Sequence, residues 1–162
     1  MRVVLDTSAF IYLNDFRMFE EIFTVSEVIE EVKDKITSLK LQGITMEIME
    51  PSGNFVKKVI SAAKETGDYE KLSKTDIKVL ALANEFNLTI ISDDYNVQNV
   101  AEKLGIDYMS VFNKRITRLI KWGNYCKTCK NFFENESTCP KCGSKLTRIA
   151  RQIGNLSQKA KV

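Results

Sequence analysis

Leu88-Thr-Ile-Ile91-Ser-Asp-Asp94 is the stretch that decides the fold, because a short β-branched run is followed there, after one serine, by two acidic residues. Arg2-Val-Val-Leu5, followed by Asp6, repeats this pattern at the N-terminus, and residues 106–109 predict a further short strand. Segments with apolar residues at helical spacing separate these strands. We therefore expect an α/β fold with a parallel sheet flanked by helices on both faces.

The helices are predicted from their caps and from the spacing of their apolar residues. Ser26 can cap a helix whose apolar positions continue to Ile36. Further helices are expected over about 54–65, 72–83 and 97–104. Residues 44–49 fit a strand or a helix, and the pattern does not choose between them.

Acidic residues gather where the predicted strands end and where helices begin. They are Asp6, Asp76, Asp93, Asp94, Glu27, Glu30 and Glu31. Each alone has an ordinary explanation as a helix cap, a capping-box partner or part of a solvated face. Together, however, acids at the carboxyl edge of a parallel sheet would repel one another unless a cation neutralised them. Oxygen-rich clusters of this kind suit Mg²⁺ or Mn²⁺.

All four cysteines lie in one 17-residue stretch, as Cys126-Lys-Thr-Cys129 and Cys139-Pro-Lys-Cys142. Two such pairs predict one closed, tetrahedral zinc site that stabilises a fold and performs no chemistry. Gly143 follows the second pair and tolerates a positive φ. Two disulfides or a redox pair are the alternatives, and neither suits a chain without a secretory signal or any other cysteine.

Charge divides the chain into two parts of opposite sign. Residues 1–112 hold 12 Lys/Arg and 19 Asp/Glu, a net −7, whereas residues 113–162 hold 12 Lys/Arg and two glutamates, a net +10. The basic part also carries Trp122, Tyr125, Phe132 and Phe133, whose rings can stack on bases. This combination predicts nucleic-acid binding. The alternative is a solvated, lysine-rich module whose aromatic residues fill a small core.

Composition excludes several classes of enzyme. The chain has no histidine, which rules out Ser-His and Cys-His nucleophiles, histidine-based RNA cleavage and histidine metal ligands. The sequence also lacks both glycine-rich phosphate-binding motifs, G-x-G-x-x-G and G-x-x-x-x-G-K. With 44% hydrophobic and 28% charged residues and no apolar run near the roughly 20 residues of a membrane span, the sequence predicts a protein of the reducing cytoplasm.

Four motifs occur in the order found in the PIN-domain nucleases, which this sequence resembles. They are Val-Leu-Asp6-Thr-Ser-Ala-Phe, Val28-Ile-Glu-Glu31-Val, Leu72-Ser-Lys-Thr-Asp76-Ile-Lys and Ile91-Ser-Asp-Asp94-Tyr. Gly67-Asp-Tyr before the third motif, Asp94-Tyr-Asn-Val-Gln-Asn-Val and the C-terminal cysteines are similar to the compact, archaeal form of the Nin-one-binding-protein family. The resemblance covers about residues 1–145.

This resemblance implies a PIN-like α/β fold with a Cys₄ zinc ribbon and an endoribonuclease dependent on Mg²⁺ or Mn²⁺. The catalytic and metal-binding residues that it implies are Asp6, Glu31, Asp76 and Asp94. Glu27 lies one helical turn before Glu31, and Asp93 precedes Asp94, so both are candidates for the outer shell. The implied substrate is single-stranded precursor rRNA at the 3′ end of the small-subunit rRNA, within a pre-ribosomal particle that also offers ribosome-assembly proteins as partners.

The ribbon is expected to bind the RNA, because the net-negative nuclease part attracts RNA poorly. The candidate contacts are Arg115, Arg118, Lys121, Trp122, Lys127, Lys130, Lys141, Lys145 and Arg148. A non-catalytic RNA-binding adaptor and a toxin-like PIN ribonuclease are the alternative functions.

The expected organisation has four parts. They are a nuclease domain over 1–112, a basic linker over 113–124, a zinc ribbon over 125–148 and a basic, mobile tail over 149–162.

Overall fold

A five-stranded, all-parallel sheet forms the centre of the N-terminal domain. The structure is a computed structural model that describes residues 1–33, 43–112, 116, 118–134 and 136–154. The strands are β1 (Arg2–Leu5), β2 (Glu21–Thr24), β3 (Glu47–Ile48), β4 (Thr89–Ile91) and β5 (Tyr108–Met109), in the order β3-β2-β1-β4-β5. The predicted α/β class is therefore confirmed.

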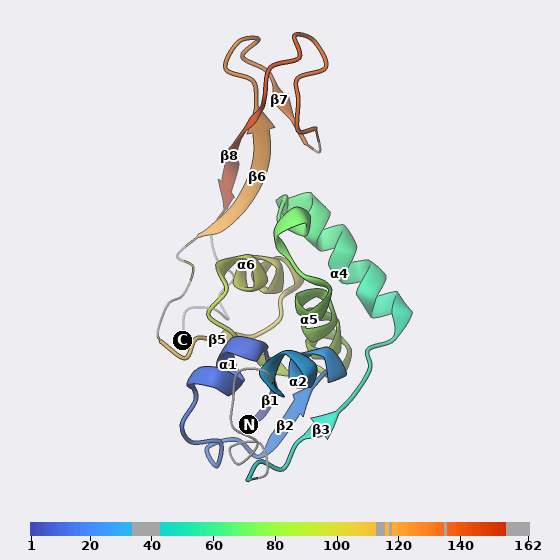
Figure 1. The fold of residues 1–162 in the computed structure, drawn as a ribbon, viewed down its shortest axis with the longest axis vertical. Coiled ribbons are helices and arrows are strands. Elements are labelled where there is room, and N and C mark those ends of the chain that lie inside the picture. Colours follow the sequence, from blue (N-terminus) through green and yellow to red (C-terminus); the bar gives the residue numbers. More distant parts are fainter. Residues whose placement is uncertain (34–42, 113–115, 117, 135, 155–162) are drawn as a thin grey trace.

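Helices connect these strands. They are α1 (Thr7–Tyr12), α2 (Ser26–Lys33), α4 (Gly53–Thr66), the 3₁₀ turn η1 (Tyr69–Lys71), α5 (Lys74–Phe86) and α6 (Tyr95–Leu104). α1 packs against α2, whereas α4, α5 and α6 pack against one another (Figure 1). Because parallel crossovers are right-handed, connections that run to opposite edges of the sheet lie on opposite faces. The strand order reverses between β1 and β4, so this pair is the switch point at which α/β sheets bind ligands.

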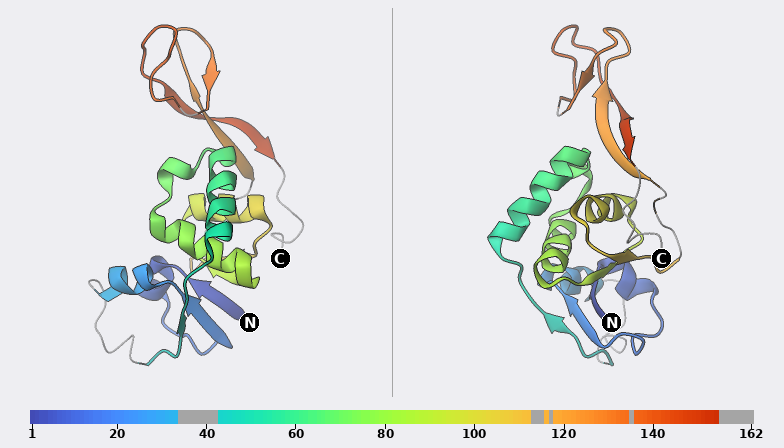
Figure 2. Two further views of the ribbon diagram at one scale, coloured as in Figure 1. Left: turned by 90° about the vertical axis from the view of Figure 1, so that its right-hand side faces the viewer. Right: turned by 180° about the vertical axis from the view of Figure 1, so that it is seen from behind.

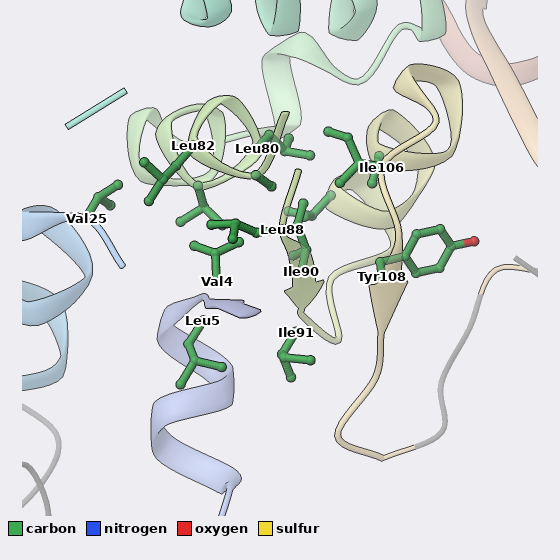
Figure 3. Close-up of a cluster of buried hydrophobic side chains, with 14 of the residues drawn as sticks. Val4, Leu5, Val25, Leu80, Leu82, Leu88, Ile90, Ile91, Ile106 and Tyr108 are labelled. Carbon is green, nitrogen blue, oxygen red and sulfur yellow. The ribbon is translucent and has the colours of Figure 1, made fainter. Parts of the chain in front are cut away.

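One buried core joins the sheet to α1, α2, α4, α5 and α6, and α5 contributes much of it. Val4 of β1 and Ile90 of β4 are paired in register and fully buried, and Figure 3 shows Leu80 and Leu82 of α5 beside them. β1 and β4 are short and apolar because both faces of a central parallel strand are covered. This packing fixes the carboxyl ends of the two strands, where the acidic residues begin.

A second sheet rises from the first domain as a long hairpin. β6 (Leu119–Tyr125) pairs antiparallel with both β7 (Phe132–Phe133) and β8 (Thr147–Gly154), in the order β7-β6-β8. The cysteine loops lie at the far end of this hairpin, and its base lies beside α6 (Figures 1 and 2). Within the described ranges, no helix is both long and apolar enough to cross a membrane.

Several local expectations are corrected or resolved. Residues 119–124 form most of β6, not a linker, and residues 149–154 form most of β8, not a tail. Leu119 pairs with Gly154 across the hairpin, so each segment forms a strand by antiparallel pairing with the other. Residues 44–49 contain a strand, β3, and β2 was not predicted at all. The helix that begins at Ser26, α2, was predicted to continue to Ile36, which lies outside the described ranges. The final residues 155–162 also lie outside them.

Candidate active site and metal centre

Asp6 lies at the switch point of the sheet, directly after β1. Leu5 is in register with Ile91, and the Asp6 side chain is only 6% exposed. Its Oδ1 caps α1 by accepting hydrogen bonds from Ala9 N at 2.7 Å and Ser8 Oγ at 2.8 Å. Burial raises the pKa of Asp6 from 3.8 to about 6, against hydrogen bonds that lower it, and the charge of Asp76 adds to the rise.

Asp76 lies in the first turn of α5 and forms a complete capping box with Ser73. Ser73 N donates to Asp76 Oδ2 at 2.8 Å, and Asp76 N donates to Ser73 Oγ at 3.0 Å. Asp76 therefore caps α5, but this role does not prevent its carboxylate from also taking part in the acidic site. Burial raises the pKa of Asp76, and the negative charges of Asp94 and Glu31 raise it further.

Glu31 is held at this site by two hydroxyl groups. Thr7 Oγ1 donates to Glu31 Oε2 at 2.6 Å, and Thr75 Oγ1 donates to Glu31 Oε1 at 2.7 Å. Thr7 follows Asp6, and Thr75 precedes Asp76. The two threonines therefore bring a glutamate from α2 to the two aspartates, although the motif analysis had assigned them no role.

Glu27 is engaged elsewhere. Lys78 of α5 forms an ion pair with Glu27 and another, at 2.6 Å, with Glu50. Although burial works in the opposite direction, the hydrogen bond from Lys78 lowers the pKa of Glu27. Glu30 and Glu31 are both exposed, but Glu31 is the one that accepts the hydroxyl groups of Thr7 and Thr75. The local geometry thus distinguishes Glu31, beside the aspartates, from Glu27, which already has a cation.

Asp94 and Asp93 point to different partners. Asp94 caps α6, and its Oδ1 accepts from Asn96 N at 2.7 Å and from Asn96 Nδ2 at 2.9 Å. Asp93 Oδ1 accepts instead from Ser110 Oγ and, at 3.2 Å, from Phe112 N. Asp93 Oδ2 is buried and has no hydrogen-bond partner in the described structure.

The electrostatics of the cluster Asp6, Glu31, Asp76 and Asp94, here called the acidic quartet, favour an added cation. Across the described ranges, no lysine or arginine forms a salt bridge with any of these four side chains. Among the described residues, the four cysteines are the one group of possible metal ligands whose ligand atoms, the sulfurs, all lie within 4.8 Å of one another. The carboxylate oxygens of the quartet are therefore more widely spaced than these sulfurs. Four carboxylates without a protein cation match the ligand chemistry of Mg²⁺ and Mn²⁺.

The four cysteines converge from two equivalent turns. Lys130 N donates to Cys126 O and Gly143 N donates to Cys139 O, both at 2.8 Å. The residue after each pair has positive φ, 55° at Lys130 and 70° at Gly143. All four Sγ atoms, including those of Cys129 and Cys142, lie within 4.8 Å of one another. Tetrahedral zinc with bonds of about 2.3 Å requires sulfurs about 3.8 Å apart, so the cluster fits a zinc ion.

The hairpin is fastened to the first domain by a buried contact, which we call the seam. Arg148 Nη2 donates to Asp68 Oδ1 at 2.9 Å and to Gly67 O at 3.0 Å, and its guanidinium lies 4.1 Å from the ring centre of Trp122. Asn99 Nδ2 donates to Asp68 Oδ2 at 2.6 Å and to Ile120 O at 2.7 Å. Asp68 is fully buried, and the arginine offsets part of its desolvation, although burial still raises the pKa of Asp68.

This seam changes the expected set of RNA contacts. Arg148 is committed to Asp68, which corrects its assignment as an RNA-binding side chain. The exposed candidates on the hairpin and its loops are Arg118, Lys127, Lys130, Lys141 and Lys145, whereas Lys121 and Trp122 are half-buried. Arg115 lies outside the described ranges. The motif Gly67-Asp-Tyr marks one side of the seam in the sequence. The other side, Arg148, lies 80 residues after Asp68, so the sequence pattern could not pair them.

Comparisons with known proteins match this chain to a family and to several relatives. The family described as PIN domain of ribonuclease matches residues 3–86. The chain is 37% identical over 159 residues to "Endoribonuclease Nob1" of Pyrococcus abyssi, covering 94% of this chain and 96% of that protein. It is 36% identical to "Endoribonuclease Nob1" of Archaeoglobus fulgidus, with coverages of 94% and 92%. It is 34% identical over 100 residues to "20S-pre-rRNA D-site endonuclease nob1" of Schizosaccharomyces pombe, covering 59% and 26%.

Proposed function

This chain belongs to the PIN-domain ribonucleases and, among them, to the archaeal Nob1 endoribonucleases, and we propose that it is a metal-dependent enzyme. Its proposed substrate is single-stranded precursor rRNA, which it cleaves at the 3′ end of the small-subunit rRNA. The observation that carries the proposal is the acidic quartet at the β1/β4 switch point, without a protein cation in the described structure. The fission-yeast relative, a 20S-pre-rRNA D-site endonuclease, supports the choice of precursor rRNA as the substrate.

The quartet would hold one or two Mg²⁺ or Mn²⁺ ions, which bind the scissile phosphate and lower the pKa of a bound water. The rest of the site positions the ligands. Thr7 and Thr75 orient both oxygens of Glu31, while Ser73 fixes Asp76. Asp93 stays in the outer shell of this proposal, where its buried Oδ2 can accept a hydrogen bond from water. The expected products carry a 5′-phosphate and a 3′-hydroxyl.

The ribbon would bind one zinc ion through Cys126, Cys129, Cys139 and Cys142 and would supply the affinity for RNA. Four lysines around the cysteine loops are exposed: Lys127, Lys130, Lys141 and Lys145. Lysine–phosphate contacts release counterions, so binding through this face should weaken steeply with salt. We place this activity in the cytoplasm, on a pre-ribosomal particle and beside other ribosome-assembly proteins.

Two other functions are weaker explanations. A non-catalytic adaptor would not need two hydroxyl groups to hold Glu31 against a pair of aspartates whose pKa values are already raised by crowding and burial. A toxin-like ribonuclease needs only the first domain, whereas the two archaeal Nob1 relatives align along 94% of the chain, the ribbon included. The seam also gives the ribbon a fixed position on the nuclease domain.

The test is cleavage of an RNA that spans the small-subunit rRNA 3′ end. The zinc-loaded chain is incubated with Mn²⁺, with Mg²⁺ or with neither, and the new ends are mapped. Asp76→Asn and Glu31→Gln should lower the rate at least a hundredfold, equivalent to about 2.7 kcal/mol. Glu27→Gln is the matched control, because Glu27 lies on the same helix but is paired with Lys78. Full activity without the added metals, or in Glu31→Gln, would reject the proposal.

A further inference from the structure

A cavity of about 420 Å³ lies in the groove between α6 and the base of the hairpin. Tyr95 and Asn96 contribute to it from the first turn of α6, while Ile120, Trp122 and Ile153 contribute from β6 and β8. Figure 1 shows the base of β6 and β8 beside α6. This volume is within the range of about 300–1,000 Å³ that is typical of small-ligand sites.

The lining matches the chemistry of an unpaired nucleobase. The indole of Trp122, the phenol of Tyr95 and three isoleucines supply flat and apolar surface. Base–aromatic stacking is sequence-tolerant because every base has a π-face. Arg118 is exposed at the rim and forms no salt bridge with any carboxylate in the described structure, so its charge can meet a phosphate.

The carboxylate in the cavity wall does not oppose an RNA. Asp68 contributes to the lining, but its Oδ1 accepts from Arg148 and its Oδ2 accepts from Asn99. The charge of Arg148 neutralises that of Asp68 within the seam. Arg118 is therefore the remaining charged group of the lining.

Asn96 connects the cavity to the acidic quartet. The residue lines the cavity, and both its backbone N and its Nδ2 donate to Oδ1 of Asp94, at 2.7 and 2.9 Å. The cavity therefore begins one side chain away from a carboxylate of the quartet. A base held in the cavity would carry a phosphate that is close enough to reach the quartet.

We propose that this cavity is a nucleotide subsite that takes one unpaired base of the RNA substrate, next to the bond that is cleaved. The inference rests on the proposed function and extends it. Tyr95 and Trp122 contact the base, Arg118 contacts a neighbouring phosphate, and the subsite sets which phosphate meets the acidic quartet. Base pairing would keep the base out of the cavity, so the subsite also selects single-stranded RNA.

The test combines protein variants with RNAs that lack one base. Each nucleotide around the cleavage site is replaced in turn by an abasic one, and cleavage is measured with the full, zinc-loaded chain. One position next to the cleaved bond should be sensitive, with a loss of about tenfold or more. Tyr95→Ala and Arg118→Ala should each cleave the intact RNA more slowly than the wild type does. Removing the base at the sensitive position should then lower the cleavage rate of these variants little further, because the side chain and the base act through the same contact.

The matched control is Tyr12→Ala, because Tyr12 and Tyr95 are both 52% exposed and only Tyr95 lines the cavity. In Tyr12→Ala, removal of the base at the sensitive position should lower the cleavage rate as much as it does in the wild type. Additive losses in Tyr95→Ala, or no sensitive position on an RNA that the wild type cleaves, would overturn the subsite.

A binding measurement separates this inference from the proposed nuclease activity. Without added Mg²⁺ or Mn²⁺, 2-aminopurine placed at successive positions should be quenched at one position, and this quenching should fall in Arg118→Ala. Equal quenching in the wild type and the variant would overturn the subsite, whatever the outcome of the cleavage assay. Quenching with no metal-dependent cleavage would support the subsite and reject only the proposed function.

Discussion

Replacing Gly67 by alanine tests the seam between the hairpin and the nuclease domain. Gly67 ends α4 with a φ of 78°, and a Cβ at this position would lie 2.8 Å from Trp122 O and 2.9 Å from Trp122 Cβ. Gly105 ends α6 in the same left-handed conformation, with a φ of 70°, but a Cβ there meets nothing within 4 Å. The two positions share a backbone constraint and differ in their surroundings, so Gly105→Ala is the matched control.

The two substitutions should therefore differ in size. A left-handed conformation costs an alanine about 1–2 kcal/mol, so Gly105→Ala should lower the free energy of unfolding by that amount. Gly67→Ala carries the same cost and also forces β6 away from α4, and overpacking of this kind adds about 1–3 kcal/mol. The expected loss for Gly67→Ala is about 2–5 kcal/mol.

Urea unfolding of the zinc-loaded chain measures both losses. Trp122 is the one tryptophan of the chain and lies at the seam, so its emission reports local movement as well as unfolding. In the folded state, Gly67→Ala should change the emission of Trp122, and Gly105→Ala should leave it unchanged. Equal losses of stability, with the same folded-state emission in both variants, would refute the seam as a packed contact.

Three further perturbations have defined outcomes. In buffer with zinc but without Mg²⁺ or Mn²⁺, the folded chain should lose up to about 3 kcal/mol from Asp6 as the pH rises through about 6, because burial raises the pKa of Asp6 above its unfolded value. This stabilisation is complete only below about pH 3.8. In urea titrations, Asp6→Asn should remove this part of the pH dependence and leave a smaller part from Asp76 and Asp68, whose pKa values are also raised; an undiminished pH dependence in Asp6→Asn would contradict the assignment. Lys130→Gly should stabilise the zinc-loaded ribbon by about 1 kcal/mol, because φ there is 55° and Gly143 occupies the equivalent position; an unchanged zinc-chelation midpoint would contradict this. Cys129→Ser should collapse the amide signals of residues 126–146 into the narrow random-coil range, because so short a segment buries too little core without its metal, while the dispersed signals of β1 and β4 persist. A ribbon whose signals stay dispersed in this variant would rule out the metal requirement.

The sheet and its acidic edge were accessible from the sequence because local patterns encode them. β1 and β4 are β-branched runs that end in acid, and Ser73 and Asp76 form the capping box that their spacing predicts. Gly143 adopts the positive φ that was expected after the second cysteine pair. In each case the residues that decide the structure lie within a few positions of one another.

The features that escaped prediction depend on distant partners. β8 is a strand because β6 lies beside it, 22 residues earlier at the nearest pair, Tyr125 and Thr147, and neither strand has a strong apolar alternation of its own. Arg148 reads as a solvated basic residue until Asp68 is brought to it by the turn at the end of α4. The hydroxyl groups of Thr7 and Thr75 acquire their role only when α2 presents Glu31 between them.

A sulfur substitution in the RNA tests the central claim, that the acidic quartet holds an ion in contact with the scissile phosphate. One non-bridging oxygen of that phosphate is replaced by sulfur, in each stereoisomer, and cleavage by the zinc-loaded chain is compared in Mg²⁺ and in Mn²⁺. Mg²⁺ binds sulfur poorly, whereas Mn²⁺ accepts softer ligands. One stereoisomer should be cleaved at least tenfold more slowly than the normal RNA in Mg²⁺ and should recover in Mn²⁺. Equal sulfur effects in the two metals, for both stereoisomers, would contradict direct contact between the metal and the phosphate.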